Sequence, residues 1–226
     1  MNSYSQSLLL ICFLFTTNIV FGQVNDVDLE RITPKNLKKS LVKTQLFMVD
    51  NIINLPTTCP RIKDSTHYFH NYTVYFDAPI DSVWNAYNTV SPTKVWNSKI
   101  ISFGFAYARA DNQLYYEDEI IDHLEVGQIQ FLSLRYLGGI FKLTNALELT
   151  KIDENSKSLQ FCYMRYGKSQ GTQIIKLTEE NGRTKVTHNT YYKSGSKFRD
   201  KRLYPYFHEI TVKDLHENIG AILNNE

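Results

Sequence analysis

Few residues of this sequence have the types and spacing that chemistry requires, and His208 stands first among them. It lies within the segment 199–223, among apolar residues spaced three and four positions apart, between Tyr204 and Val212. In a helix such spacing places these residues and Leu215 on one face. An imidazole on a buried face needs a hydrogen-bond partner from the protein or from a ligand. Three roles for His208 follow: structural hydrogen bonding, contact with a ligand, or proton transfer as a general acid or base.

A second histidine, His188, occupies a predicted strand. It shares one strand face with Val186, Thr190 and Tyr192, because side chains two positions apart point the same way. Two possibilities stay open, that this face is turned to the interior or that it is exposed. In the first case His188 and Tyr192 are candidates for lining a cavity.

Arg165 is a candidate for holding the carboxylate of a ligand, because guanidinium groups bind carboxylates through paired hydrogen bonds. It shares a predicted strand face with Leu159, Phe161 and Tyr163. If that face is the inner one, Arg165 and Tyr163 border the interior. The alternative is a solvated arginine at the edge of the sheet.

The sequence contains no motif that is typical of a metal site or a cofactor site. No second histidine follows the His208-Glu209 pair four residues later, so the spacing of a zinc-binding helix is missing. The glycine-flanked run 167–171 joins two predicted strands and does not lead into a helix, so we interpret it as a hairpin rather than a phosphate-binding loop. We therefore expect no metal, no cofactor and no catalytic nucleophile.

The composition is typical of a globular protein. The 226 residues, 42% hydrophobic and 21% charged, suffice for one well-buried domain. The formal net charge is +2 without a long charged run, so the concentrated basic face that nucleic-acid binding needs is not indicated. Tyrosine (15 residues) and phenylalanine (13 residues) are abundant, and both suit strands as well as pocket linings.

Residues 1–22 are predicted to form a secretory signal peptide. The apolar run from Leu8 to Phe15, extended to Phe21, is shorter than a bilayer span needs. Gly22, with Val20 two positions before it, provides a cleavage site. The n-region lacks the usual Lys or Arg, and an uncleaved membrane anchor is the alternative. A signal peptide predicts a secreted or periplasmic protein.

Removal of this segment leaves two cysteines. Cys59 lies in a predicted loop and Cys162 within a predicted strand. In an oxidising compartment these two cysteines could form a disulfide, but we favour a buried free thiol at Cys162.

Residues 23–63 form an N-terminal extension with one predicted helix. Pro34 starts the helix, which ends before Pro56, and its apolar residues at helical spacing are Leu37, Leu41, Val42, Leu46 and Val49. We expect it to pack on the outside of the main domain or to act as a spacer from the membrane. The residues from Pro56 to Ser65 are predicted to be a linker.

From His67 the apolar pattern changes to the alternation typical of strands. The first strand, expected to have both faces partly covered, stops at Asp77-Ala78-Pro79, and a short helix follows. Further strands are predicted at 100–107, 113–121, 128–136, 141–152, 159–166, 172–179 and 185–192. In the second of the eight strands, Phe103, Phe105 and Tyr107 are expected to share one bulky face.

The run Tyr72 to Trp84, YTVYFDAPIDSVW, resembles the opening strand and helix of START-like domains. This SRPBCC superfamily includes Bet v 1-like proteins, polyketide cyclases and lipid-transfer domains. The resemblance covers about residues 67–225 and implies an α+β helix-grip fold, a bent antiparallel sheet around a long C-terminal helix with a hydrophobic cavity between them. Since that fold has seven strands, either 113–121 is irregular, as its acidic Glu117-Asp118-Glu119 favours, or two segments form one bent strand.

The resemblance implies a function for the domain at 64–226. We expect an exported binding or carrier protein for a hydrophobic small molecule, such as a lipid or a polyketide-like ring compound. The candidate contacts are His208, Tyr204, Val212, Leu215, Phe103, Phe105, Tyr107, Tyr163, Arg165, His188 and Tyr192.

Two other functions stay open. One is an enzyme of the cyclase or aromatase kind, in which His208 or a cavity tyrosine moves protons. The other is a structural or interaction module with a filled core. In addition, the basic stretch Lys193–Arg202 is a candidate for contact with anionic membrane lipid. The sequence does not indicate an oligomeric state.

Overall fold

Residues 26–59 and 66–224 are described by the structure, a computed structural model. The predicted signal peptide, residues 1–22, lies outside the described residues. None of the described helices is long and apolar enough to cross a bilayer.

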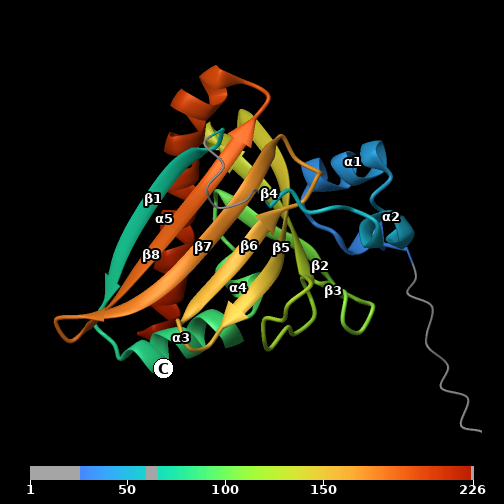
Figure 1. Cartoon of the computed structure of the whole chain (residues 1–226). Coiled ribbons are helices and arrows are strands. Elements are labelled where there is room, and N and C mark those ends of the chain that lie inside the picture. Colours follow the sequence, from blue (N-terminus) through green and yellow to red (C-terminus); the bar gives the residue numbers. More distant parts are fainter. Residues whose placement is uncertain (1–25, 60–65, 225–226) are drawn as a thin grey trace, which may run out of the picture.

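One antiparallel sheet of eight strands, strongly bent, organises the molecule (Figure 1). Its strand order is β1-β8-β7-β6-β5-β4-β2-β3. The strands are β1 (Tyr68–Phe76), β2 (Ile101–Ala108), β3 (Gln113–Tyr116), β4 (Gln128–Tyr136), β5 (Phe141–Asp153), β6 (Ser158–Tyr163), β7 (Ser169–Glu180) and β8 (Arg183–Ser194).

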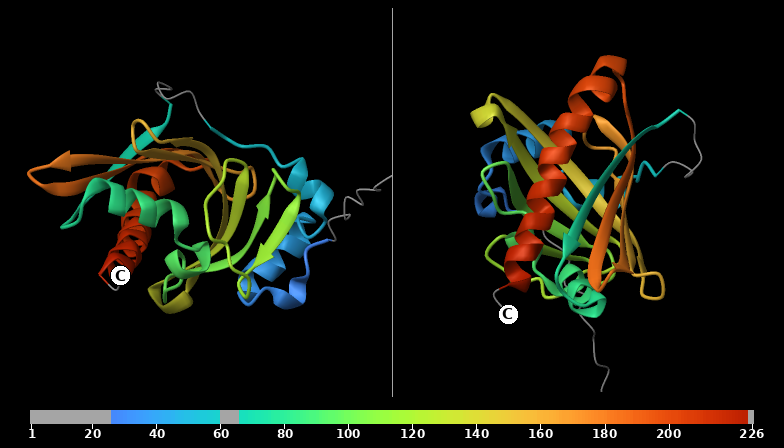
Figure 2. Two further views of the ribbon diagram at one scale, coloured as in Figure 1. Left: turned by 90° about the horizontal axis from the view of Figure 1, so that it is seen from below. Right: turned by 90° about the vertical axis from the view of Figure 1, so that its left-hand side faces the viewer.

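Three helices lie on the inner face of the sheet. They are α3 (Ile80–Thr89), α4 (Pro92–Val95) and the long C-terminal α5 (Tyr204–Leu223), around which the sheet bends (Figure 2). A π-helical turn, Arg199–Leu203, leads into α5. The spacing of its apolar residues correctly predicts the buried stripe of α5, which includes Val212, Leu215 and Ile219. The helix-grip fold expected from the sequence is confirmed.

The edge strand β1 differs from the expectation of two partly covered faces. Its residues alternate between half-buried and exposed along the whole strand. The exposed positions include Phe69 and Tyr75, because no described element covers the outer face of this edge. The remaining face lies against α5.

Strand β3 accounts for the extra strand in the sequence count. It ends at Tyr116, ahead of the acidic run Glu117-Asp118-Glu119, and forms a short hairpin at the edge beyond β2. The acidic run instead binds the N-terminal extension: the Arg31 guanidinium pairs with Asp118 and with Glu119 Oε1 at 3.0 Å. The first alternative, an irregular 113–121 segment, therefore holds only beyond Tyr116, because residues 113–116 form a regular eighth strand.

A β-bulge divides strand β2 into two parts that face opposite ways. The register with β4 shifts between Phe103 and Phe105, so one extra residue is inserted at Gly104. Phe103 packs in the inner core with α5, whereas Phe105 and Tyr107 belong to a separate cluster on the outer face. The expectation that these three side chains share a face is wrong, because a shift of one residue reverses the direction of every side chain beyond it.

The N-terminal extension covers the outer face of β2, β4 and β5. It contains a 3-10 turn (Leu29–Arg31), α1 (Lys35–Thr44) and α2 (Val49–Ile53), so two helices replace the single predicted one. The break falls at Gln45, which adopts a left-handed backbone conformation. Of the five predicted apolar positions, only Val42 is exposed.

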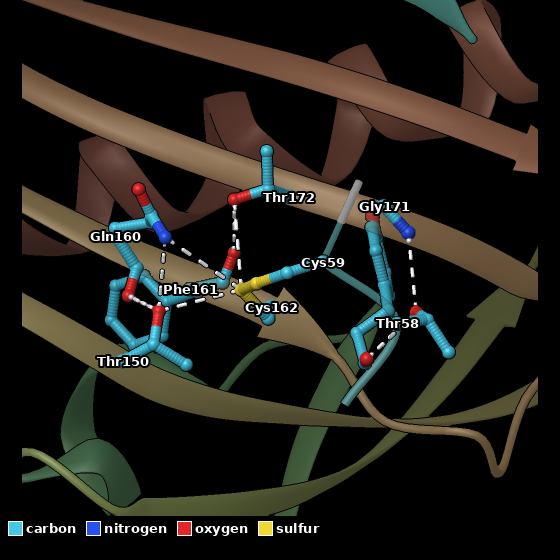
Figure 3. Close-up of a disulfide and its surroundings, with 9 residues drawn as sticks. Thr58, Cys59, Thr150, Gln160, Phe161, Cys162, Gly171 and Thr172 are labelled. Atoms are coloured by element: carbon cyan, nitrogen blue, oxygen red, sulfur yellow. Dashed lines mark hydrogen bonds between the residues drawn. A yellow bond between two sulfur atoms is a disulfide. The ribbon is translucent and has the colours of Figure 1, made fainter. Parts of the chain in front are cut away.

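A disulfide between Cys59 and Cys162 fastens the linker to strand β6 (Figure 3). The two Cα atoms are 5.2 Å apart, and the bond joins residues 103 positions apart. Thr58 N donates to the Tyr163 carbonyl at 2.7 Å, so the linker runs across the outer face of the sheet. The preference for a free thiol at Cys162 is wrong, because the extension folds back over the strand that carries this residue.

Candidate functional site

A chain of hydrogen-bonded polar side chains is buried between the sheet and α5. Tyr87 Oη lies 2.5 Å from His216 Nδ1, and His216 Nε2 lies 3.1 Å from His188 Nδ1. His188 Nε2 is 2.8 Å from Gln173 Oε1, and Gln173 Nε2 donates to Tyr163 Oη at 2.7 Å. These side chains, from α3, α5, β8, β7 and β6, define the buried polar chain.

The orientation of Gln173 sets the tautomer of each histidine in the chain. Its carbonyl oxygen can only accept, so His188 donates from Nε2 and accepts at Nδ1. His216 must then donate from Nε2 and accept the Tyr87 hydroxyl at Nδ1. Both histidines are neutral in this arrangement, and every ring nitrogen has a partner.

His208 belongs to a neighbouring polar group, and its ring centroid lies 5.7 Å from that of His188. Its Nε2 atom lies 3.2 Å from Thr190 Oγ1, and its Nδ1 atom lies 3.2 Å from His70 Nδ1. His70 in turn lies 3.9 Å from the exposed carboxylate of Glu209. Both ring nitrogens of His208 are therefore occupied by protein groups, as the structural role requires.

Three tyrosines close the other end of the buried polar chain. The hydroxyl groups of Tyr163 and Tyr204 are hydrogen-bonded to each other. The Tyr204 ring stacks on Tyr192 with ring centroids 3.6 Å apart, and the Tyr192 hydroxyl donates to the Asp200 carbonyl at 2.8 Å. The start of α5 is thus fixed to strands β6 and β8 by aromatic groups with satisfied hydroxyls.

Burial keeps the histidines of this region neutral. Desolvation lowers the pKa of His208 and that of His216 to about 3, with the nearby His70 and His216 adding to the effect at His208. The pKa of His188 lies well below its ordinary value, first because of desolvation and then because of the other histidines. Burial also raises the pKa of Tyr87 well above its ordinary range. None of these groups carries a charge near neutral pH.

An apolar cavity adjoins the buried polar chain. Its volume is about 40 Å³, counted as the space open to the centre of a water molecule. Gln130, Gln173 and His188 are among its lining residues. Gln130 accepts from the Trp96 indole at 2.7 Å and donates to Gln128 at 2.8 Å. The lining consists of Tyr87, Val90, Pro92, Val95, Trp96, Leu124, Gln130, Leu147, Leu159, Phe161, Gln173, Ile175, His188, Leu215 and Ile219.

Val90 and Leu124 are the two lining residues that are only half-buried, so the cavity comes nearest to the surface there, and we call this place its mouth. Val90 also borders a second hollow of about 390 Å³ by the same measure, which Ile120, Ile121 and Ile222 help to line. Val90 therefore borders both spaces, at the end of the molecule that holds α3 and α4, and the surface hollow is lined by polar and charged residues as well as by isoleucines.

The structure brings together only part of the predicted set. Leu215 and His188 line the cavity, and the inward orientation of His188 is one of the two possibilities left open by the sequence. Six others do not line the cavity but are buried or half-buried on the inner face, namely His208, Tyr204, Val212, Phe103, Tyr163 and Tyr192.

Three predicted residues lie elsewhere. Phe105 and Tyr107 are on the outer face, as the bulge dictates. Arg165 is exposed and follows the end of β6, where its backbone nitrogen donates to the Pro56 carbonyl at 2.9 Å. Arg165 is therefore exposed to solvent, which was the second possibility left open by the sequence, because β6 ends before it.

Sequence reasoning missed His216, Gln173 and Tyr87. A signal for His216 was present, since it follows His208 by two full helical turns and so falls on nearly the same face. Gln173 and Tyr87 gave no such signal, because a single polar group among apolar neighbours does not reveal its partner. Within the residues that the structure describes, no group of three or more histidine, cysteine or acidic side chains is arranged to hold a metal ion.

Comparison with known proteins supports the fold. No family model matches the sequence, and no curated protein is significantly similar to it. Among solved structures, the ginseng major latex-like protein 151 from Panax ginseng is similar with a TM-score of 0.50 and 14% identity, over 70% of this chain and 97% of that chain.

Two further structures agree with this result. Ara h 8.0201 has a TM-score of 0.50 and 10% identity, over 71% of this chain and 99% of the other. A norcoclaurine synthase mutant from Thalictrum, in complex with a transition-state analogue, has a TM-score of 0.51 and 12% identity, over 70% of this chain and 95% of that one.

The chain thus has an α+β helix-grip fold. Within that class its fold is the one of START-like and Bet v 1-like proteins, so the resemblance seen in the sequence is confirmed at the level of the fold.

Proposed function

We propose that this protein binds a hydrophobic small molecule between the sheet and α5. The observation that carries the proposal is the apolar cavity, whose lining residues include Gln130 and Gln173. Each amide nitrogen uses one of its two N–H groups within the protein. The second N–H of each amide is a donor for a ligand, so the preferred ligand is an apolar molecule with a hydrogen-bond acceptor at its inner end.

The size of the cavity limits how such a ligand can fit. Pockets for drug-sized ligands have volumes of about 300–1,000 Å³, and the inner cavity alone is far smaller. A ligand of that size must extend through the mouth at Val90 into the hollow lined by Ile120 and Ile222. Movement of α4 and of the segment around Leu124 would widen the path further.

An enzymatic function receives less support from the geometry. His208 does not line the cavity, and with a pKa near 3 it is a weak base. The norcoclaurine synthase among the similar structures is an enzyme by its name, which says nothing about the groups in this chain.

Export is a further part of the proposal. The disulfide between Cys59 and Cys162 supports it, because such bonds persist mainly in oxidising compartments. Cell fractionation followed by N-terminal sequencing tests this. We expect the mature protein outside the cytoplasm and starting at Gln23, whereas a cytoplasmic protein that retains Met1 would contradict export.

A blocked mouth tests the binding proposal. V90W should reduce the affinity for the apolar dye 1-anilinonaphthalene-8-sulfonate at least about tenfold, because the larger ring fills the mouth. V42W is the matched control, since Val42 is exposed on α1 at the opposite face of the sheet. Native mass spectrometry of the wild-type protein should reveal a co-purifying molecule that V90W lacks. Equal dye affinity in both variants, together with no bound molecule, would favour a filled core instead.

A further inference from the structure

We propose that one end of the molecule docks on an anionic membrane surface. This end consists of the tip of the β4–β5 hairpin, residues 137–143, and the segment 193–206 that leads into α5. Both parts lie at the top of the molecule in two perpendicular views (Figures 1 and 2, right). We call it the docking end.

The docking end exposes large apolar side chains. Ile140 is 80% exposed and Phe198 is 67% exposed, and the others are Leu137, Phe141, Leu143, Leu203 and Tyr206. Phe207 joins the two parts, since its ring centroid lies 6.1 Å from that of Phe141 and 5.3 Å from that of Tyr206. Soluble proteins rarely expose so many large apolar side chains at one end without a partner.

Basic residues are concentrated in one of the two parts of the docking end. The segment 193–202 contains five basic residues and one acidic residue, in a chain whose formal charge is only +2. The acidic residue, Asp200, is buried and accepts from the Ser194 backbone nitrogen at 3.0 Å. Among the described ion pairs, none involves the exposed Lys197, Lys201 or Arg202.

An anionic lipid surface matches both features at once. Apolar tips enter the boundary between headgroups and acyl chains, while Lys and Arg interact with the anionic headgroups. A nucleic acid would satisfy the charges but would leave Ile140 and Leu137 in contact with phosphates. Charge and apolar exposure together therefore favour the membrane.

The docking end lies opposite the mouth of the cavity. Val90 and Leu124 lie at the end that holds α3, α4 and the C-terminus, as the path of α5 shows in Figure 1. A molecule docked in this way presents its mouth to the solution rather than to the lipid. Docking of this kind does not depend on whether the cavity binds a ligand.

Vesicle sedimentation of the full mature chain tests the proposal. The protein should sediment with vesicles containing phosphatidylglycerol and much less with pure phosphatidylcholine. The triple variant K197E/K201E/R202E should weaken binding at least about 100-fold, because each cation near an anionic surface contributes about fivefold. The control K39E/K43E reverses two exposed charges on α1 and should retain binding. No sedimentation of the wild-type protein, or equal loss in both variants, would overturn the proposal.

The orientation is tested by a pair of tryptophan reporters. Ile140 and Ile120 are both at least 80% exposed but lie at opposite ends of the molecule. Brominated lipid chains should quench the added fluorescence of I140W and leave that of I120W unchanged. Quenching of I120W instead would place the mouth on the membrane. A vesicle-independent association of I140W with another protein would also contradict the proposal.

Discussion

The inner and outer faces of the sheet are packed in different ways. On the outer face, α1 and α2 cover a mainly aromatic and aliphatic cluster in which Phe105 stacks on Phe131 with ring centroids 4.3 Å apart. On the inner face, the helices enclose the buried polar chain and leave the cavity beside it. A fully packed face contributes mainly to stability, whereas a face with space and satisfied polar groups retains the means to recognise a ligand.

The largest expected effect is on the outer face. F131A should lower the free energy of unfolding by about 3–5 kcal/mol, because Phe131 is fully buried in the outer cluster. Dye binding to the folded fraction should be unchanged, since Phe131 does not line the cavity. Urea titration measures the stability, and F69A, at an exposed position of β1, is the control. Loss of dye binding in folded F131A would show that the two faces are coupled.

Removal of the disulfide should have the next largest effect. C59S/C162S should lose about 2–4 kcal/mol of stability, because the bond closes a loop between residues 103 positions apart. The single variants should lose as much, and reductant should reproduce the loss in the wild-type protein alone. If reductant left the denaturation midpoint of the wild-type protein unchanged, the disulfide would not stabilise the fold.

Acidification should weaken the inner face selectively. The pKa values of His208 and His216 are about 3 when folded and about 6.5 in an unfolded chain, so the unfolded chain takes up more protons below pH 6.5. Their contribution is complete above pH 6.5 and falls as the pH drops towards 3, by about 2 kcal/mol for each histidine between pH 7 and pH 5.

Urea denaturation from pH 8 to pH 4 measures this loss. F69A, at an exposed position without a titratable group, should keep the wild-type pH dependence, and H208F should show a shallower one. A denaturation midpoint that stays constant between pH 7 and pH 5 would mean that these histidines become protonated in the folded protein.

The smallest effect is expected from H208F at neutral pH. Loss of the contact with Thr190 should cost about 1–3 kcal/mol, because the buried hydroxyl then loses a partner. Thermal denaturation measures it, and dye affinity should stay within about twofold because His208 does not line the cavity. If an identified substrate were turned over about a hundredfold more slowly by folded H208F, the enzymatic alternative would replace the binding proposal.

The sequence predicted the architecture well where a repeating pattern was long. The spacing from Tyr204 to Ile219 located α5 and its buried stripe. The alternation in β8 put Val186, His188 and Thr190 on one common face, and the structure shows that this face is the inner one. Such patterns are reliable because many residues report the same periodicity.

The sequence did not predict features that depend on a single residue, such as a bulge or the exact end of a strand. The bulge at Gly104 reversed Phe105 and Tyr107, and the end of β6 before Arg165 placed that side chain in solvent. The partners of Cys162 and His216 come from distant segments, so no local pattern could reveal them. The site depends on such long-range pairs, and this explains why it was less predictable than the fold.

The close approach at Gly104 links the extension to the rest of the chain. A Cβ atom at this position would collide with the side chain of Leu37, and it would lie 3.2 Å from the Phe131 carbonyl oxygen. Leu37 therefore occupies the space that a side chain on β2 would otherwise fill. The N-terminal extension thus forms part of the core on the outer face of the sheet. Cooperative unfolding in one transition should result, with the extension and the sheet losing their protection from hydrogen exchange together.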